Sequence, residues 1–309
     1  HQVPDDVKAA VPEEVRRAAR AMAEQGLRER LHEIGMTAAE GDEYVQLVTA
    51  VERQIRQVRA IFQRAQARQR ERVWLPNQTD GDLDERRLVD AITGETTVFR
   101  RRGEDPFEMG LLQAHPKRLR FVFDLSGSMY RFDGVDGRLA RETEAAVLLM
   151  EALAGLDPRR LVYDMGGHSG DSPWIPLVAF GQPPEHAGDR WKIVQRMVAH
   201  TQYCSSGDFT LESIEHAVTD IVAQPADEYI VVVLSDANLH RYGIRADALR
   251  AAMDRDPRVA TYLLFIGSLG AQAQVLVDQL PAGRAFLCMD PSTLPGVFQH
   301  ILSQSAPRV

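Results

Sequence analysis

The sequence predicts an α/β protein whose main domain is a doubly wound, mostly parallel β-sheet preceded by an α-helical hairpin. Two observations support this prediction. After Lys117, short apolar runs alternate with longer helical patterns, which indicates βαβ units and a sheet covered on both faces. Before Lys117, the chain is highly charged and has the periodicity of helices.

Residues 1–73 are predicted to form the α-helical hairpin. Pro12-Glu13-Glu14 supplies the proline and early acids typical of a helix start, and Gly35 suits the position just after its end. Thr37–Glu40 has the spacing of a capping box that starts a second helix. Apolar residues then recur at helical spacing at Val48, Val51, Ile55, Val58 and Phe62. We expect this stripe to pack on the following domain; a separate coiled coil that binds a partner is the alternative.

Residues 74–116 are predicted to be a connector rich in turn residues, with a short helix at Leu83–Ala91 and a short strand at Thr96–Arg100. Residues 117–309 are predicted to form the α/β domain. Its strands are expected at Leu119–Phe123, Leu161–Asp164, Ile175–Phe180, Tyr229–Leu234, Thr261–Ile266 and Ala285–Cys288. Its helices are expected at Arg138–Leu156, Asp189–His200, Leu211–Ala223, Arg245–Arg255, Ala271–Leu280 and Leu294–Ser303.

Composition and charge exclude several classes of function. The 309 residues are 44% hydrophobic and 26% charged, as in an ordinary globular protein. No apolar run reaches the roughly 18 residues that span a membrane. The net charge of −8 argues against a nucleic-acid binder, which needs a concentrated basic surface. The start at His1 has neither a methionine nor a signal-peptide pattern, so we expect the natural chain to extend further upstream.

Lysine and cysteine usage excludes two further kinds of site. Lysine occurs only at Lys8, Lys117 and Lys192, and none of them follows a glycine. The fragment therefore has no P-loop, whose lysine neutralises nucleotide phosphates. Cys204 and Cys288 are too few for a disulfide framework or a four-thiolate zinc site, so we expect free buried thiols.

The first strand of the predicted α/β domain runs directly into a string of oxygen donors. Asp124, Ser126 and Ser128 place one carboxylate and two hydroxyls on alternate residues. A loop of this kind can direct all three oxygens toward one cation. Alone, the pattern is weak, because aspartate and serine are common in turns and helix caps.

Two other loops strengthen this prediction. Ser235-Asp236 directly follows the apolar run Tyr229–Leu234, and the Asp236 carboxylate would act mainly through a bound water. Between the loop at Asp124–Ser128 and Asp236 along the chain, Asp208 and Thr210 come just before a predicted helix and offer a further ligand. Ligands of open α/β sheets bind beyond the carboxyl ends of the strands, so we expect these loops to converge on one ion. Oxygen donors favour Mg²⁺, with Ca²⁺ or Mn²⁺ as alternatives.

These residues resemble the metal-ion-dependent adhesion site (MIDAS) of von Willebrand factor A domains. The resemblance is closer to the family of von Willebrand factor A domain-containing protein 8, and it covers nearly the whole chain. The matching strings are Gly81–Asp84, Thr93–Glu95, Ser126–Phe132, Asp136–Leu139, Gly167–Asp171, Ser206–Asp208, Leu234–Leu239 and Phe265–Gly270.

This resemblance implies a Rossmann-like, non-catalytic, protein-binding domain in an AAA+ ATPase system. The ATPase module would lie in the same natural chain or in a separate subunit, as in the related cobaltochelatase. The bound ion would contact an acidic residue of a client protein or ring subunit, without nucleic acid or membrane. A bacterial homologue would be cytoplasmic, and a eukaryotic one mitochondrial.

The chain departs from the usual adhesion site at one position. Many such sites have Gly-Thr-x-Thr where this chain has Gly207–Thr210, so that Asp208 replaces the usual coordinating threonine. If Asp208 binds the ion, three carboxylates cancel its charge and weaken its attraction for an outside carboxylate. If Thr210 binds instead, the electrophilic site is retained. Both assignments stay open from sequence.

Other interpretations compete with metal-dependent protein binding. A phosphatase of the haloacid-dehalogenase type needs a second aspartate at position 126, which is serine, and a lysine at a strand end. A serine hydrolase needs Gly-x-Ser-x-Gly, which is absent around Ser126 and Ser169. A scaffold with a vestigial metal site is the third alternative.

Several residues near the predicted metal edge have both a functional and a structural interpretation. The histidines either line the site or bind a loop backbone, the arginines either bind an acidic partner or are caps and solvated side chains, and the aromatics either anchor an interface or pack in the core. These residues are His168, His240, Arg131, Arg138, Trp174 and Tyr203.

Overall fold

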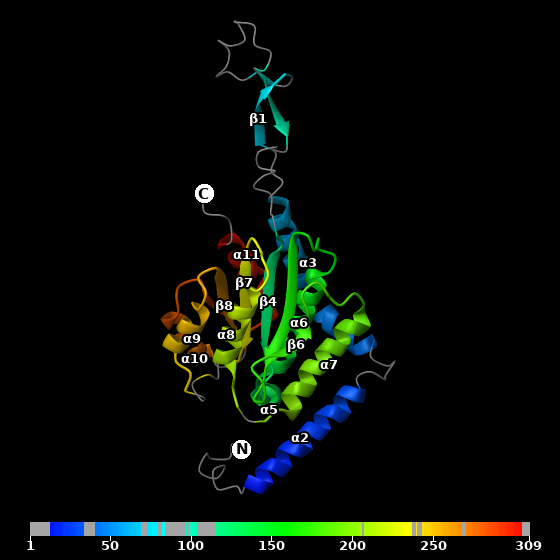
Figure 1. The fold of residues 1–309 in the computed structure, drawn as a ribbon. Coiled ribbons are helices and arrows are strands. Elements are labelled where there is room, and N and C mark those ends of the chain that lie inside the picture. Colours follow the sequence, from blue (N-terminus) through cyan, green and yellow to red (C-terminus); the bar gives the residue numbers. More distant parts are fainter. Residues whose placement is uncertain are drawn as a thin grey trace.

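The centre of the molecule, described from a computed structural model, is a six-stranded sheet with helices on both faces (Figure 1). The structure describes residues 13–33, 41–68, 73–79, 82–83, 97, 99–103, 115–205, 207–236, 239, 243–266 and 270–304. The predicted order, with helices first and an α/β domain after them, is confirmed.

The strand order of the central sheet is β6-β5-β4-β7-β8-β9. The strands are β4 Lys117–Asp124, β5 Leu161–His168, β6 Ile175–Val178, β7 Tyr229–Ser235, β8 Val259–Phe265 and β9 Ala285–Leu287. All neighbours are parallel except the edge strand β6, which runs antiparallel to β5. The predicted doubly wound, mostly parallel sheet is therefore confirmed, with each of its six strands at an expected place. The chain adds β5 and β6 on one side of β4 and β7 to β9 on its other side. The strand order therefore switches between β4 and β7, where ligands of such folds bind.

Helices cover both faces of this sheet. They are α5 Gly127–Asp136, α6 Arg138–Leu153, α7 Ala187–Tyr203, α8 Thr210–Ile221, α9 Ala246–Met253, α10 Gly270–Gln279 and α11 Leu294–Gln304, with the 3₁₀ turn η4 Pro291–Thr293. The six helices expected in the α/β domain are all present. The sequence did not predict α5, because Met129 is its single buried large apolar residue and no stripe marks it. Gly137, with φ of 64°, ends α5 in the left-handed conformation that favours glycine.

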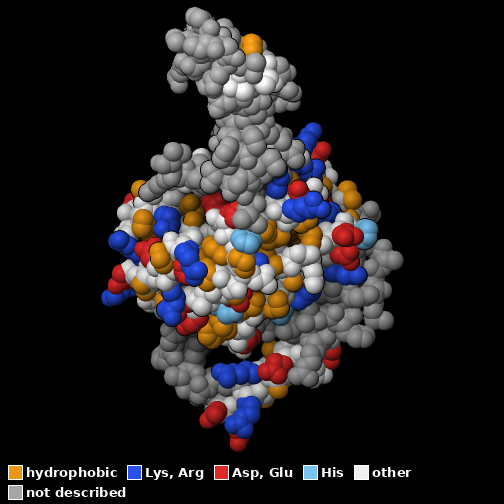
Figure 2. Space-filling view, turned by 45° about the horizontal axis from the view of Figure 1, so that its top comes forward, with side chains coloured by type: hydrophobic (Ala, Val, Ile, Leu, Met, Phe, Trp, Pro, Cys, Tyr) orange, Lys and Arg blue, Asp and Glu red, His pale blue; other side chains and the backbone are white. Residues whose placement is uncertain are grey.

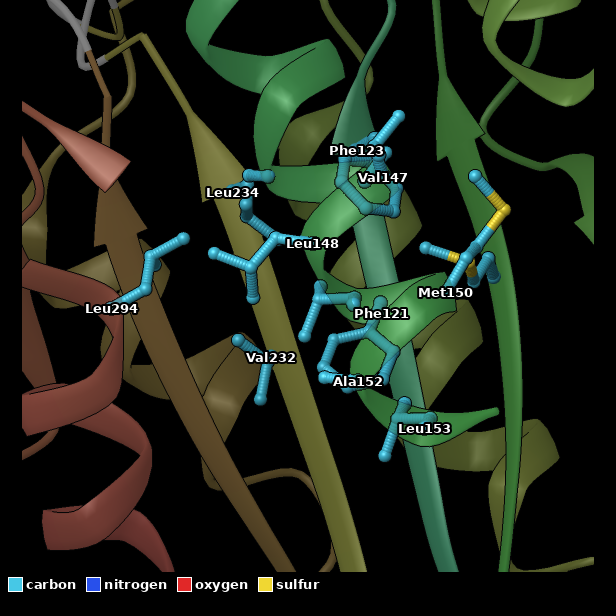
Figure 3. Packing of buried hydrophobic residues seen from close by; sticks show 14 of the residues in the cluster. Phe121, Phe123, Val147, Leu148, Met150, Ala152, Leu153, Val232, Leu234 and Leu294 are labelled. Atoms are coloured by element: carbon cyan, nitrogen blue, oxygen red, sulfur yellow. The ribbon is translucent and has the colours of Figure 1, made fainter. Parts of the chain in front are cut away.

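Strand β4 divides the hydrophobic core into two parts by alternating its side chains. Leu119, Phe121 and Phe123 belong to the cluster that includes α6, α7 and α11, whereas Val122 packs with α8 to α10. Figure 3 shows Phe121 and Phe123 beside α6 and the neighbouring strand β7. All four β4 side chains are at most 1% exposed. Burial of such side chains contributes about 1.5–3 kcal/mol each. The core therefore holds β4 in place, and with it Asp124 at the end of the strand.

The helices α2 Glu13–Glu33 and α3 Gly41–Arg68 both contact the α/β domain. Val51, Ile55, Val58 and Phe62 of α3 are at most 5% exposed, and α3 packs against α6 and α11. The expectation that this stripe packs on the following domain is therefore confirmed. Helix α2 packs against α7 and lies along the lower side of the molecule in Figure 1.

The connector contains a small antiparallel sheet of its own, with strand order β1-β3-β2. Its strands are β1 Val73–Gln78, β2 Asp82–Leu83 and β3 Phe99–Gly103. The strand predicted at Thr96–Arg100 overlaps β3. The strands β1 and β2 were not predicted; β1 contains Pro76, and proline is unusual within a strand. The helix predicted at Leu83–Ala91 lies outside the described residues, except for Leu83 in β2. The domain boundaries at 73/74 and 116/117 stay predictions.

The second face of β4 carries a buried ion pair. Arg120 is 2% exposed and donates three hydrogen bonds to Asp164 of β5 at 2.6–3.1 Å. It also bonds Asp220 of α8 at 2.7 Å. Burial alone would lower the pKa of Arg120, but both carboxylates together raise it. The Trp174 ring lies 4.7 Å from the same guanidinium, so Trp174 is a packing residue of this cluster.

On the face drawn in Figure 2, the residues that the structure describes do not gather basic side chains into one patch. Among the described residues there, basic and acidic side chains are interspersed around a central hydrophobic area. Within the described part of the chain, no helix combines the length and the apolar character needed to cross a bilayer.

Candidate metal centre

The topology brings the predicted ligands to one edge of the sheet. Asp124 is the last residue of β4 and lies in register with His168, the last residue of β5. Asp236 directly follows Ser235, the last residue of β7, on the other side of β4. Parallel strands lie about 4.8 Å apart, so the carboxyl ends of β5, β4 and β7 form one continuous edge.

A chain of hydrogen bonds joins four of the predicted site residues. The Asp124 carboxylate accepts the Ser126 backbone N–H at 3.0 Å. The Ser126 and Ser128 hydroxyls lie 2.8 Å apart, and Ser128 donates to Asp236 Oδ2 at 3.0 Å. All four residues are at most 3% exposed. The structure therefore brings Asp124, Ser126, Ser128 and Asp236 together, as the sequence predicted.

Asp208 and Thr210 lie next to this group. Asp208 Oδ1 accepts both the Thr210 backbone N–H at 2.6 Å and its hydroxyl at 2.5 Å. The Thr210 hydroxyl is also 3.5 Å from His168 Nε2. The charge of Asp208 acts on Asp124, since it contributes to a raised pKa there. The third loop therefore reaches the site, with its two candidate ligands bonded to each other.

The loop after β5 holds this third loop in place. Asp171 accepts the backbone N–H of Ser205 at 2.9 Å. Gly170 lies so close to the backbone of Ser205 and Gly207 that an added Cβ atom would overlap both. The close approach explains the glycine at position 170, and the hydrogen bond explains the aspartate at position 171. Sequence reasoning did not assign this role to Asp171.

The electrostatics of the centre are dominated by buried carboxyl groups. Burial, followed by the charges of Asp236 and Asp208, raises the pKa of Asp124 well above its usual range. Glu142 of α6 is fully buried and accepts the Asp124 backbone N–H at 2.8 Å. Its second oxygen has no hydrogen-bond partner within the described residues, and burial beside Asp124 raises its pKa strongly. Burial lowers the pKa of His168 to about 4.

The arginines after the metal loop have structural contacts. Arg131 Nε donates to the Gly127 carbonyl at 3.0 Å and so braces the loop. Arg138 is only 4% exposed and bonds the carboxylates of Asp136 and Asp236, which corrects the interpretation of a solvated side chain. The sequence offered a signal for this, because Asp136-Gly137-Arg138 was part of the family resemblance. His240 lies outside the described residues.

The remaining predicted residues lie in other environments. Tyr203 is half-buried and its ring faces Gly26 of α2. Cys288 is buried and Cys204 is half-buried, and both are free thiols, as expected.

The donor set fits a hard divalent cation. Carboxylate and hydroxyl oxygens are the ligands that Mg²⁺ and Ca²⁺ prefer. Half of the six predicted ligands are hydroxyls, and the described part of the chain contains no group of three or more His, Cys, Asp or Glu side chains arranged for a metal ion. The oxygens of Asp124, Ser126, Ser128 and Asp236 converge in one buried place. Because they are fewer than the six ligands of an octahedral ion, they suit an ion that keeps several waters.

This fold and this site define a class of protein. A mostly parallel α/β sheet with Asp-x-Ser-x-Ser at the end of its first strand and an aspartate after the neighbouring strand is a von Willebrand factor A domain. Comparison with known proteins then identifies a particular relative. Over 305 residues, 99% of this chain, the sequence is 45% identical to von Willebrand factor A domain-containing protein 8 of Mus musculus. The family resemblance seen in the motifs is therefore confirmed.

The chain spans 16% of the length of that mouse protein. No protein-family model matches the chain. Among solved structures, it is similar to BatB from Bacteroides thetaiotaomicron, with a TM-score of 0.44, 14% identity and coverage of 61% of this chain and 98% of the other. It is also similar to a von Willebrand factor type A protein from Catenulispora acidiphila, with a TM-score of 0.41, 13% identity and coverage of 62% and 43%.

A third similar structure is the proximal thread matrix protein 1 from the mussel byssus with a zinc-occupied MIDAS motif. Its TM-score is 0.41 and its identity 13%, with coverage of 62% of this chain and 46% of the other. Likenesses at this level say nothing about what this chain binds.

Proposed function

We propose that this chain is a divalent-metal-dependent protein-binding domain. Asp124, Ser126 and Ser128 would hold the ion directly, and Asp236 would contact it through water. Asp208 or Thr210 would supply the remaining ligand. The supporting observation is the buried chain of hydrogen bonds that runs from Asp124 through both serines to Asp236.

The ion would recruit an acidic residue of a protein partner. Hydroxyl ligands leave charge on the ion, so it can attract an outside carboxylate. Mg²⁺ is the proposed ion because the donors are oxygens and Mg²⁺ tends to keep several waters, with Ca²⁺ and Mn²⁺ as alternatives. No catalytic role is proposed. We further propose that the chain serves an AAA+ ATPase, in the same natural chain or in a separate subunit. The partner would be a client or ring subunit in the cytoplasm, or in mitochondria for a eukaryotic protein.

Neither of the two lysines that the structure describes supports a phosphatase. Lys117 begins β4, whereas Asp124 ends it seven residues later, which separates their Cα atoms by about 23 Å. Lys117 also pairs with Glu228 at 2.6 Å. Lys192 lies on α7 and is half-exposed.

A scaffold with a vestigial metal site is the second candidate. The ion pair between Arg138 and Asp236 favours it, because a cationic side chain already offsets one carboxylate of the centre. The two candidates differ in whether a divalent ion binds.

Thermal unfolding with and without divalent ions separates these candidates. An ion at 100 times its dissociation constant stabilises the folded chain by about 2.7 kcal/mol. We expect millimolar Mg²⁺, Ca²⁺ or Mn²⁺ to raise the melting temperature of the wild type but not of Asp124→Ala. Asp247→Ala, which removes a carboxylate that is 65% exposed, is the matched control and should respond like the wild type. A wild type that ignores all three ions would support the scaffold.

Partner binding needs its own experiment. Affinity capture is done with the wild type and with Asp124→Ala, each in magnesium and in chelator. We expect a partner that is retained only by the wild type in magnesium. Equal capture in all four conditions would contradict metal-dependent binding.

A further inference from the structure

Arg138 is built into the candidate metal centre, whereas the sequence left open a partner contact, a cap or a solvated side chain. It is the first residue of α6, directly after the left-handed Gly137. Its Nε and Nη2 bind both oxygens of Asp136 at 2.5–3.0 Å, and its Nη1 binds Asp236 Oδ2 at 2.5 Å. The Phe132 ring lies 5.1 Å from the guanidinium carbon. The guanidinium is therefore fixed between two carboxylates and one aromatic ring.

A second Asp-x-Arg sequence in the same chain shows what is particular about this arrangement. Arg258 binds Asp256, two residues earlier, through Nε at 3.0 Å and Nη2 at 2.7 Å. The local geometry is thus the same as at Asp136 and Arg138. The Arg258 side chain, however, is 61% exposed, whereas that of Arg138 is 5% exposed. The motif itself explains the local pair, but not its burial against Asp236.

Arg138 binds the Asp236 oxygen that connects the loop after β7 with the loop after β4. Asp236 Oδ2 accepts hydrogen bonds from Arg138 and from the Ser128 hydroxyl. Asp236 and Asp208 both repel the buried Asp124 carboxylate. A fixed positive charge on Asp236 offsets part of this repulsion, and it also repels any divalent cation that enters the same centre.

We propose that Arg138 is a positioning residue that acts as an internal counter-cation of the metal centre. It holds Asp236 toward Ser128 while no ion is bound, and its charge lowers the affinity of the centre for divalent cations. Asp136 holds the guanidinium and weakens this effect. The inference rests on the proposed function, because it assigns a role toward the ion that the centre would bind.

Metal affinity of charge-altering variants tests the proposal. Mg²⁺ binding is measured by calorimetry and Mn²⁺ binding by electron paramagnetic resonance, on the whole chain. We expect Arg138→Met to bind Mg²⁺ about tenfold or more tightly than the wild type, because one nearby positive charge is removed. Its melting temperature without metal should fall. A purely structural arginine predicts the opposite for affinity, since a displaced Asp236 would bind the ion less well.

Two further variants keep the test decisive if Arg138→Met folds poorly. Arg138→Lys keeps the charge, so its Mg²⁺ affinity should stay within about threefold of the wild type. Asp136→Asn removes the anion that compensates Arg138, so Mg²⁺ should bind about tenfold more weakly. Arg258→Met, the exposed counterpart, should leave affinity unchanged.

The outcomes distinguish this inference from the proposed function. A wild type that binds Mg²⁺ or Mn²⁺, combined with unchanged or weaker binding by Arg138→Met, overturns the counter-cation and leaves the metal site standing. Absence of binding by the wild type and by every variant overturns both. Tighter binding by Arg138→Met and weaker binding by Asp136→Asn support the inference.

Discussion

The packing of α3 predicts that the α/β domain is not stable without it. Phe62 is 1% exposed, and its ring centroid lies 5.9 Å from that of Phe298 in α11. Phe298 in turn lies 6.1 Å from Phe121 of the central strand β4. Phe62 is thus connected through the Phe298 ring to Phe121 at the centre of the sheet. Helix α3 is therefore expected to unfold together with the sheet.

The variant Phe62→Ala tests this coupling. Truncation of a fully buried phenylalanine costs about 3–5 kcal/mol, because transfer free energy is lost and a cavity remains. The cost should lie in the upper part of this range, because the contact with Phe298 is aromatic and adds about 0.5–1.5 kcal/mol beyond area burial. Glu52→Ala is the control, since this side chain is on the same helix and 59% exposed. It should change stability by at most about 0.5 kcal/mol.

Urea denaturation, followed by tryptophan fluorescence and circular dichroism, measures both variants. Trp191 of α7 packs edge-to-face on Tyr44 of α3, with ring centroids 6.3 Å apart, so its fluorescence reports on the docked helix. We expect both signals of Phe62→Ala to shift together to lower urea. A fluorescence change with an unshifted main transition would refute the reasoning, because α3 would then detach without affecting the sheet.

Two other features give predictions of the same kind. Arg120→Met should lower the free energy of unfolding by about 3–5 kcal/mol in urea titrations, because Asp164 stays buried without its cation. Adding Asp164→Leu should restore most of the lost stability. A double variant as unstable as Arg120→Met would contradict this account. Burial raises the pKa of Cys288 to about 11, so iodoacetamide at pH 8 should label this thiol only after unfolding, when its pKa returns to about 8.5. Mass spectrometry follows the labelling, and rapid modification of the native chain would disprove the assignment.

The sequence predicted those elements whose residues carry their own periodicity. The α3 stripe has helical spacing, and the run Tyr229–Leu234 is long and apolar enough for a central parallel strand. The convergence of Asp124 and Asp236 was also predictable, because parallel strands end at the same edge of a sheet. These inferences needed only local pattern and one rule of topology.

Other features depend on contacts that no local pattern records. Helix α5 has no apolar stripe, since it is short and begins inside the metal loop at Gly127. The strands β1 and β2 pair with residues of β3 that lie 16–30 positions further along the chain. Arg120 lies in a strand that is otherwise core, and its partner Asp164 is 44 residues away. Such a pairing cannot be deduced from the spacing of residues.

The charge of the candidate metal centre shows the same limit most clearly. With Asp124, Asp208 and Asp236 near one ion, the sequence alone gave three negative charges against two positive ones. That balance argued against attraction for an outside carboxylate. The structure adds Arg138, whose guanidinium lies 2.5 Å from Asp236 although the two residues are 98 positions apart. With Arg138 and its buried partner Asp136 both counted, three positive charges meet four negative ones. The attraction of the centre for an acidic partner therefore depends on the whole set of buried charges and not on its ligands alone, and Arg138 offsets only part of the negative charge that Asp208 adds.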